Sequence, residues 1–163
     1  MTAPQSQQSA STCEPSSLIE LHFLGQPAPQ GSKVLTKWGG MREVSAKVQP
    51  WRASVQYACA KQYKGPVITG PVAVEITFVL PRAKNHWSTA KGKEDQLLPS
   101  APQHCTVGGD LDKLTRGLLD PLTTRCGGNV LEDDSLVVSL RVGKRYGTKN
   151  ESAGASCKIR IIS

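Results

Sequence analysis

The sequence predicts a single α+β domain, with a small mixed or antiparallel sheet and helices packed on one face. Three observations support this fold class. At 163 residues the chain is long enough for one hydrophobic core and too short for two comfortable ones. Apolar residues alternate in some segments, as in strands, and recur at helical spacing in others. These segments follow the order strand, loop, helix, strand, loop, helix, strand, strand.

Four segments have the pattern of strands. Residues 18–25 are apolar and β-branched and end at Gly25, and residues 71–81 alternate most regularly. Residues 135–147 and 156–163 alternate as well, and we expect residues 147–155 to join them as a connection of hairpin type. The residues expected to point inward in the last three segments are Val72, Val74, Ile76, Phe78, Leu80, Leu136, Val138, Leu140, Val142, Cys157, Ile159 and Ile161.

Two segments have helical spacing. In residues 50–65 the helical spacing of apolar side chains predicts a helix with Pro50 in its first turn, and Gly65 ends it. From Asp110 onward four leucines form one apolar stripe, and Pro121 ends or kinks this second helix. The residues expected to face the core are Trp51, Val55, Ala58 and Cys59 in the first helix, and Leu111, Leu114, Leu118 and Leu122, with Leu119 beside them, in the second.

The remaining segments are predicted to be irregular. Residues 1–17 lack the basic and apolar parts of a secretory signal, and we expect a disordered polar tail before a domain over residues 18–163. Residues 26–45 and 82–109 are rich in proline, glycine and polar residues, and loops of this length tend to be functional. No apolar run approaches the roughly 20 residues of a membrane span, so we expect a cytoplasmic protein.

The composition favours a partner that is a polyanion. The net charge is +7, and residues 31–64 hold seven basic residues against one acid. By contrast, six of the 13 acids lie between Asp110 and Asp134. A basic chain that gathers its acids in one segment is typical of a nucleic-acid binder with a local cation site. The five cysteines show no C-x-x-C spacing, which predicts free thiols and no zinc site.

The acidic segment has the residue types of a site for divalent cations. Asp110 and Asp112 stand where a loop becomes a helix, and residues 132–134 precede the next strand. One aspartate suffices to cap the helix, so the other acids need a different role. Carboxylates brought together from two elements repel one another unless a cation lies between them, and Mg²⁺ prefers such oxygen ligands. A non-catalytic DNA-binding module, in which Asp110 only caps the helix, is the alternative.

Residues 110–138 resemble a known family of nucleases. The runs D-L-D-K-L (residues 110–114), L-L-D-P-L (residues 118–122) and L-E-D-D-S-L-V-V (residues 131–138) are similar to the core motif of the RusA family of Holliday junction resolvases. The segments G-Q-P-A-P-Q-G-S-K (residues 25–33) and P-W-R (residues 50–52) resemble those of phage-encoded relatives. The resemblance extends over most of the chain from Leu18 onward.

The resemblance assigns roles to particular residues. The three catalytic, metal-binding aspartates of the family fall on Asp110, Asp112 and Asp134, and Asp133 is the alternative to Asp134 because Glu132 adds an acid to the run. Arg116 stands where the family has an essential lysine, and it keeps the charge but is a poor proton donor. Lys113 replaces the family's asparagine, and Asp120 is expected to be structural or to support the site.

The resemblance implies a homodimer that recognises four-way DNA junctions and cuts two strands symmetrically, using Mg²⁺ or, in its place, Mn²⁺. A nuclease acting mainly on forks or flaps is a further alternative. Trp38 and Trp87 lie among basic loop residues, where they either stack on exposed bases or pack on the core. The candidate DNA contacts are Lys33, Lys37, Arg42, Arg52, Arg82, Lys84, Lys113 and Arg116.

Overall fold

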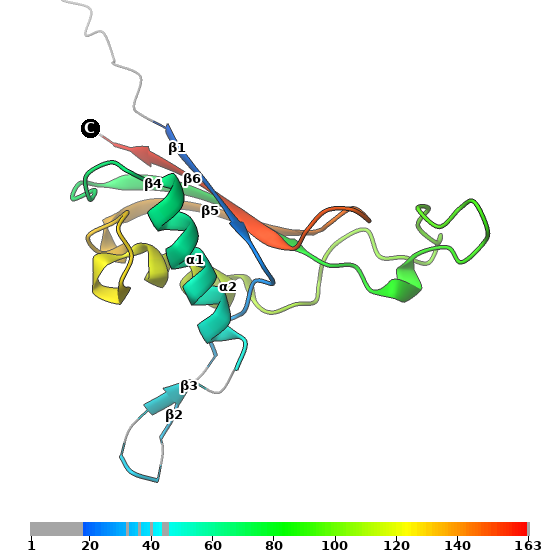
Figure 1. The fold of residues 1–163 in the computed structure, drawn as a ribbon, viewed down its shortest axis with the longest axis horizontal. Coiled ribbons are helices and arrows are strands. Elements are labelled where there is room, and N and C mark those ends of the chain that lie inside the picture. The colour runs from blue at the N-terminus through cyan, green and yellow to red at the C-terminus, as the bar shows by residue number, and fades with distance from the viewer. Residues whose placement is uncertain (1–17, 32, 36, 40, 44–45, 163) are drawn as a thin grey trace, which may run out of the picture.

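The structure, a computed structural model, describes residues 18–31, 33–35, 37–39, 41–43 and 46–162 (Figure 1). The predicted tail over residues 1–17 lies outside the described residues. Among the helices in the described ranges, none has the length and apolar character needed to cross a membrane.

A four-stranded mixed sheet forms the centre of the domain, in the order β1-β6-β4-β5 (Figure 1). The four predicted strands correspond to β1 (Leu18–Leu24), β4 (Val72–Leu80), β5 (Val137–Tyr146) and β6 (Gly154–Ile161). β6 pairs antiparallel with both β1 and β4, whereas β5 pairs parallel with β4. The predicted α+β class is therefore confirmed.

Two expectations for β5 are wrong. Its connection to β6 is not a hairpin, because β4 lies between the two strands in the sheet. The side chain of Val138 is 63% exposed, because a register shift at the start of β5 places it outside the regular ladder. Leu140 lies on the side that faces the helices, as predicted, but it is 47% exposed because β5 is an edge strand. Leu136 belongs to a short 3₁₀ turn, η4 (Asp134–Leu136), that precedes the strand.

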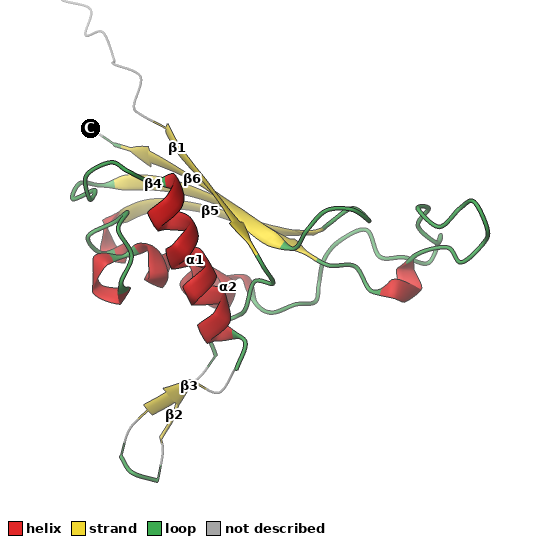
Figure 2. Cartoon of the chain, in the orientation of Figure 1, coloured by secondary structure: helices red, strands yellow, loops and turns green. Residues whose placement is uncertain are grey.

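Both helices, α1 (Val48–Gln62) and α2 (Leu111–Leu119), cover the same face of the sheet (Figure 2). Pro50 lies in the first turn of α1, as predicted. Pro121 lies in a 3₁₀ turn, η2 (Asp120–Leu122), that ends α2, which is the predicted effect of a proline. Leu111 is 36% exposed, but the other leucines of the predicted stripe are buried.

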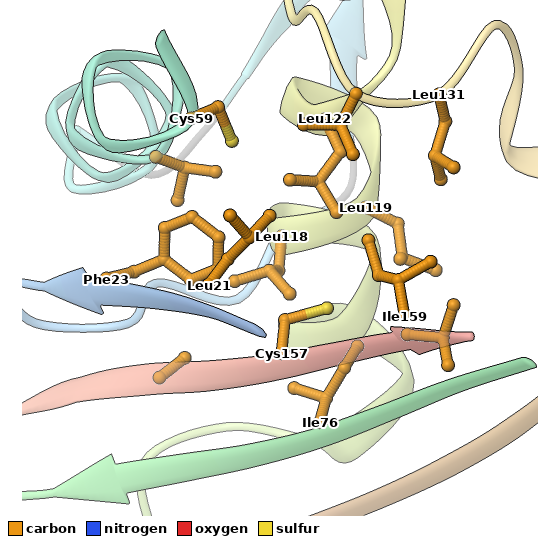
Figure 3. Packing of buried hydrophobic residues seen from close by; sticks show 14 of the residues in the cluster. Leu21, Phe23, Cys59, Ile76, Leu118, Leu119, Leu122, Leu131, Cys157 and Ile159 are labelled. Atoms are coloured by element: carbon orange, nitrogen blue, oxygen red, sulfur yellow. The ribbon is translucent and has the colours of Figure 1, made fainter. Parts of the chain in front are cut away.

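The hydrophobic core lies between this face of the sheet and the helices. Figure 3 shows Phe23 of β1, Ile76 of β4 and Leu118 of α2 converging in it. Cys59 of α1 and Cys157 of β6 are buried there as free thiols, and burial raises the pKa of each to about 12. All four described cysteines are free, as predicted, and Cys13 lies outside the described residues.

The two predicted loops differ in outcome. Residues 26–45 contain a two-stranded antiparallel hairpin, β2 (Lys33–Leu35) and β3 (Met41–Glu43), which was not predicted because strands of three residues are too short to show a period. Residues 82–109 are largely irregular, as predicted, with a 3₁₀ turn at η1 (Lys84–His86). They form an arm that projects from the end of the sheet (Figure 1).

Candidate active site

A glycine turn leads the chain into α2. Gly108 and Gly109 have φ values of +85° and +105°, which favour glycine, and an added Cβ at Gly109 would lie 2.8 Å from Pro29. Asp110 follows in an extended conformation at the N-cap position, but its side chain accepts no backbone N–H. Its carboxylate instead lies 3.0 Å from Nζ of Lys113, and this hydrogen bond raises the pKa of Lys113. Asp110 therefore begins α2 as the partner of a lysine.

A pocket of about 370 Å³ lies between α2, η4 and β5. Asp112 and Arg116 lie four residues apart on α2, so they share a face of the helix. Asp134 comes from η4, immediately before β5. The structure thus brings Asp112, Arg116 and Asp134 to one pocket from two separate parts of the sequence. The other lining residues are Leu111, Thr115, Leu119, Leu140 and Val142.

The apolar side of this pocket follows from the register of the sheet. Leu140 and Val142 of β5 lie opposite Val74 and Ile76 of β4, which face the helices. Because β5 is the edge strand, its apolar side chains are covered only in part, and they border the pocket. Charged groups beside apolar side chains interact more strongly than they do in open water.

The neighbouring acids have other contacts. Asp133 is the N-cap of η4, and its carboxylate accepts the backbone N–H of Ser135 at 3.0 Å. Hydrogen bonding to Ser135 holds the pKa of Asp133 below its usual value. Neither Asp133 nor Asp110 lines the pocket, whereas Asp134 does. In the described part of the chain, no group of three or more acidic, histidine or cysteine side chains is arranged to hold a metal ion.

The candidate DNA contacts are divided between free and engaged side chains. Lys37 and Lys84 are exposed. Arg52 lies 3.7 Å from Asp120, an ion pair that links α1 to η2 and gives Asp120 a structural contact. The guanidinium of Arg82 lies 4.4 Å from the ring centre of Tyr146. Lys33 and Arg42 lie in β2 and β3, but their side chains lie outside the described part of the structure.

Lys144 is a supporting residue that sequence reasoning missed. It lies opposite Phe78 in the β4–β5 register, on the side of the sheet that faces the helices. Its Nζ donates to the carbonyl oxygens of Gly109 at 2.6 Å and Val107 at 3.2 Å. Lys144 therefore ties β5 to the turn that precedes Asp110. The sequence did contain a signal for this role, because Lys144 falls at an inward-facing position in the alternating pattern of β5.

The comparisons with known proteins identify the family. The family model described as Endodeoxyribonuclease RusA matches residues 25–159. The crossover junction endodeoxyribonuclease RusA of Aquifex aeolicus is 22% identical over 142 residues, which cover 87% of this chain and 90% of the relative. The uncharacterized protein YqaN of Bacillus subtilis is 28% identical over 152 residues, which cover 89% of this chain and 97% of the relative. The class of protein is an endodeoxyribonuclease. The chain belongs to the RusA family.

Proposed function

We propose that this protein resolves four-way DNA junctions by paired, symmetric nicks that depend on Mg²⁺. The observation that carries this proposal is the pocket that Asp112, Arg116 and Asp134 line together, in a chain of the RusA family. A homodimer would present two equal sites to the two equivalent phosphates of a two-fold junction. The reaction would take place in the cytoplasm of the cell, or of the host cell if the chain is phage-encoded.

The donor groups of the pocket fit a magnesium ion. Asp112 and Asp134 contribute carboxylate oxygens. Mg²⁺ is commonly bound by one or two carboxylates together with waters and substrate phosphates, so two acids suffice as the protein's share. When bound, the metal supplies an activated water and stabilises charge on the phosphodiester. Asp110 stays a predicted third ligand, although its carboxylate pairs with Lys113.

The chain's own groups provide binding and orientation. Arg116 is exposed on the pocket side of α2, and its planar guanidinium suits a bidentate contact with the scissile phosphate. Arg116 thus keeps the positive charge of the family's lysine, but it does not serve as a proton donor. Lys144 holds the turn before Asp110, which fixes the start of α2 relative to β5.

Paired single-site variants test the assignment of the acids. We expect Asp112→Asn and Asp134→Asn each to lower the cleavage rate of a synthetic four-way junction in Mg²⁺ by about a hundredfold or more. Junction binding should be unchanged or tighter, because negative charge near phosphates is removed. Asp133→Asn should cut normally, since its carboxylate caps η4 outside the pocket.

Two controls separate catalysis from folding and from substrate choice. Glu20→Gln removes an acid from the uncovered face of the sheet and should leave cleavage unchanged. Rates on forks and flaps of the same sequence show whether the four-way junction is preferred. A wild-type protein that binds junctions but leaves them intact in Mg²⁺ and Mn²⁺ would contradict the proposal. If Asp134→Asn is fully active and Asp133→Asn is inactive, the catalytic role belongs to Asp133 in place of Asp134.

A further inference from the structure

We infer that a second pocket, at the base of the arm, binds an unpaired nucleobase of the branched substrate. This inference rests on the proposed function, because the branched substrate supplies the base. The pocket has a volume of about 430 Å³, within the range of pockets that hold small ligands. It lies where the arm leaves the sheet beside the turn that follows β5. The lining residues used in the argument are Arg82, Trp87, Tyr146, Thr148, Lys149 and Asn150.

Planar and cationic groups already lie against one another at this pocket. The guanidinium of Arg82 lies 4.4 Å from the ring centre of Tyr146 and donates to the carbonyl oxygen of Pro102 at 2.8 Å. The ring of His86 meets Tyr146 edge-on, with 5.8 Å between ring centres. Arg82 is therefore held over a buried ring while it lines the pocket. Unpaired bases stack on such guanidinium planes and on aromatic rings.

Trp87 supplies a second surface for stacking. Its backbone pairs with that of Leu97 across the base of the arm, and Ser88 donates to Gln96 at 2.9 Å. Nζ of Lys149 lies 5.9 Å from the centre of the indole ring and 3.0 Å from the carboxylate of Asp95. The backbone at Trp87 is thus fixed by pairing, and a cation is anchored beside the indole.

The remaining groups suit a nucleotide rather than an apolar ligand. Arg82 and Lys149 carry two positive charges against one negative charge on Asp95, so the pocket attracts a phosphate-bearing chain. Thr148 and Asn150 bring a hydroxyl and an amide, which can donate to and accept from the edge of a base. Stacking with few hydrogen bonds is the usual means of holding single-stranded bases.

The distance along β5 relates this pocket to the candidate active site. Val142 lines the active-site pocket, and Tyr146 lines the second pocket four residues further along the strand. At about 3.3 Å per residue the separation is roughly 13 Å. That span corresponds to about four nucleotides of a duplex strand at roughly 3.4 Å each. A base bound here would lie a few nucleotides from the phosphate that is cut.

An abasic scan of the substrate tests the inference. Dissociation constants are measured without divalent metal for four-way junctions that carry one abasic residue at successive positions from the branch. We expect one or two positions to weaken wild-type binding by about fivefold to a hundredfold. Trp87→Ala should weaken binding of the intact junction by a similar factor. The dissociation constant of this variant should not change further when the same positions are made abasic. Trp87→Phe should restore most of the affinity, because it keeps an aromatic face.

Two further variants keep the test independent of folding defects. Arg82→Lys preserves the charge and removes the planar group, and it should also lose the response to the abasic positions. Tyr57→Ala removes an exposed aromatic residue that pairs with Lys61 on α1, and it should keep the full response. Thermal unfolding of each variant shows that the fold is intact. Equal abasic profiles for wild type, Trp87→Ala and Arg82→Lys would overturn the inference.

The outcomes for the two proposals are distinct. If the wild-type protein cuts four-way junctions while its abasic profile is flat, the pocket inference fails and the proposed function stands. A single strand that carries 2-aminopurine serves as the second probe, since stacking quenches its fluorescence. If the protein fails to cut junctions, but quenches this probe in a Trp87-dependent way, the pocket stands and the junction function fails.

Discussion

Gly117, in the middle of α2, packs against the N-terminal segment at Ala28. An added Cβ would lie 2.6 Å from the carbonyl oxygen of Ala28. Alanine favours a helix by about 1 kcal/mol over glycine, but overpacking against backbone costs about 1–3 kcal/mol. We therefore expect Gly117→Ala to lower the free energy of unfolding, measured in urea, and to reduce cleavage by displacing α2. Gly70→Ala, where no atom lies within 4 Å, should be neutral, and a Gly117→Ala protein of wild-type stability would contradict the argument.

Glu151 gives a pH-dependent contribution at the level of a single residue. Its carboxylate accepts from both Nη atoms of Arg145, at 2.8 and 2.5 Å, and this pairing lowers the pKa of Glu151 from 4.5 to about 2. A carboxyl group whose pKa is lowered by folding stabilises the fold at any pH above its ordinary pKa of 4.5. This contribution is lost as the pH falls from about 4.5 toward 2. Glu151→Gln should therefore unfold at a lower temperature than wild type at pH 7. The difference should shrink below pH 4.5, and a constant difference from pH 7 to pH 3 would show that the ion pair is not its cause.

At the scale of elements, the attachment of α2 to the edge strand depends on Lys144. Its ammonium donates to Val107 and Gly109, and hydrogen bonds from charged groups contribute about 1.5–3 kcal/mol. We expect Lys144→Gln to lower stability by about 1–3 kcal/mol and to slow cleavage about tenfold or more, with little change in junction affinity. Lys144→Arg should recover part of the cleavage rate. Hydrogen exchange of residues 107–114 should accelerate in Lys144→Gln, and unchanged exchange there would argue against the attachment.

The positions of the elements were predictable because their signals are local. Alternation in β4 and the leucine stripe of α2 each lie within a short window of sequence. The partner of β5 was not predictable, because the choice between β4 and β6 depends on contacts far apart in the sequence. An edge strand also alternates like a central one, so the exposure of Leu140 gave no local signal.

The candidate site also has features that the sequence predicted and features that it could not predict. Helical spacing placed Asp112 and Arg116 on one face, and adjacency of helix and strand brought Asp134 to them. The pairing of Asp110 with Lys113 and the capping by Asp133 depend on side-chain conformations that spacing does not fix. Tyr146 was missed because it joins Arg82 and Trp87 only where the arm meets the end of β5.

At the scale of the whole molecule, the net charge of +7 is not spread evenly. On the face of the sheet that the helices leave uncovered, a row of alternating charges crosses all four strands. The register places Glu20 of β1 opposite Lys158 of β6, Lys158 opposite Glu75 of β4, and Glu75 opposite Arg141 of β5. Two acids balance two bases, and Lys158 lies 3.2 Å from Glu20. This row is neutral, so we expect DNA to bind over the pocket side of the molecule.

Two substitutions that each lower the net charge by one separate local contact from overall charge. If Arg116 touches a phosphate, Arg116→Gln should weaken junction binding and reduce the slope of log affinity against log salt by about 0.9, the value for one phosphate contact. Lys158→Gln removes the same charge from the neutral row and should leave the slope unchanged. Fluorescence anisotropy titrations between 50 and 200 mM salt, a range suited to phosphate contacts, measure both slopes. Equal changes in the two variants would mean that net charge alone governs binding. If the slope for Arg116→Gln equals the wild-type slope, Arg116 does not contact a phosphate of the DNA.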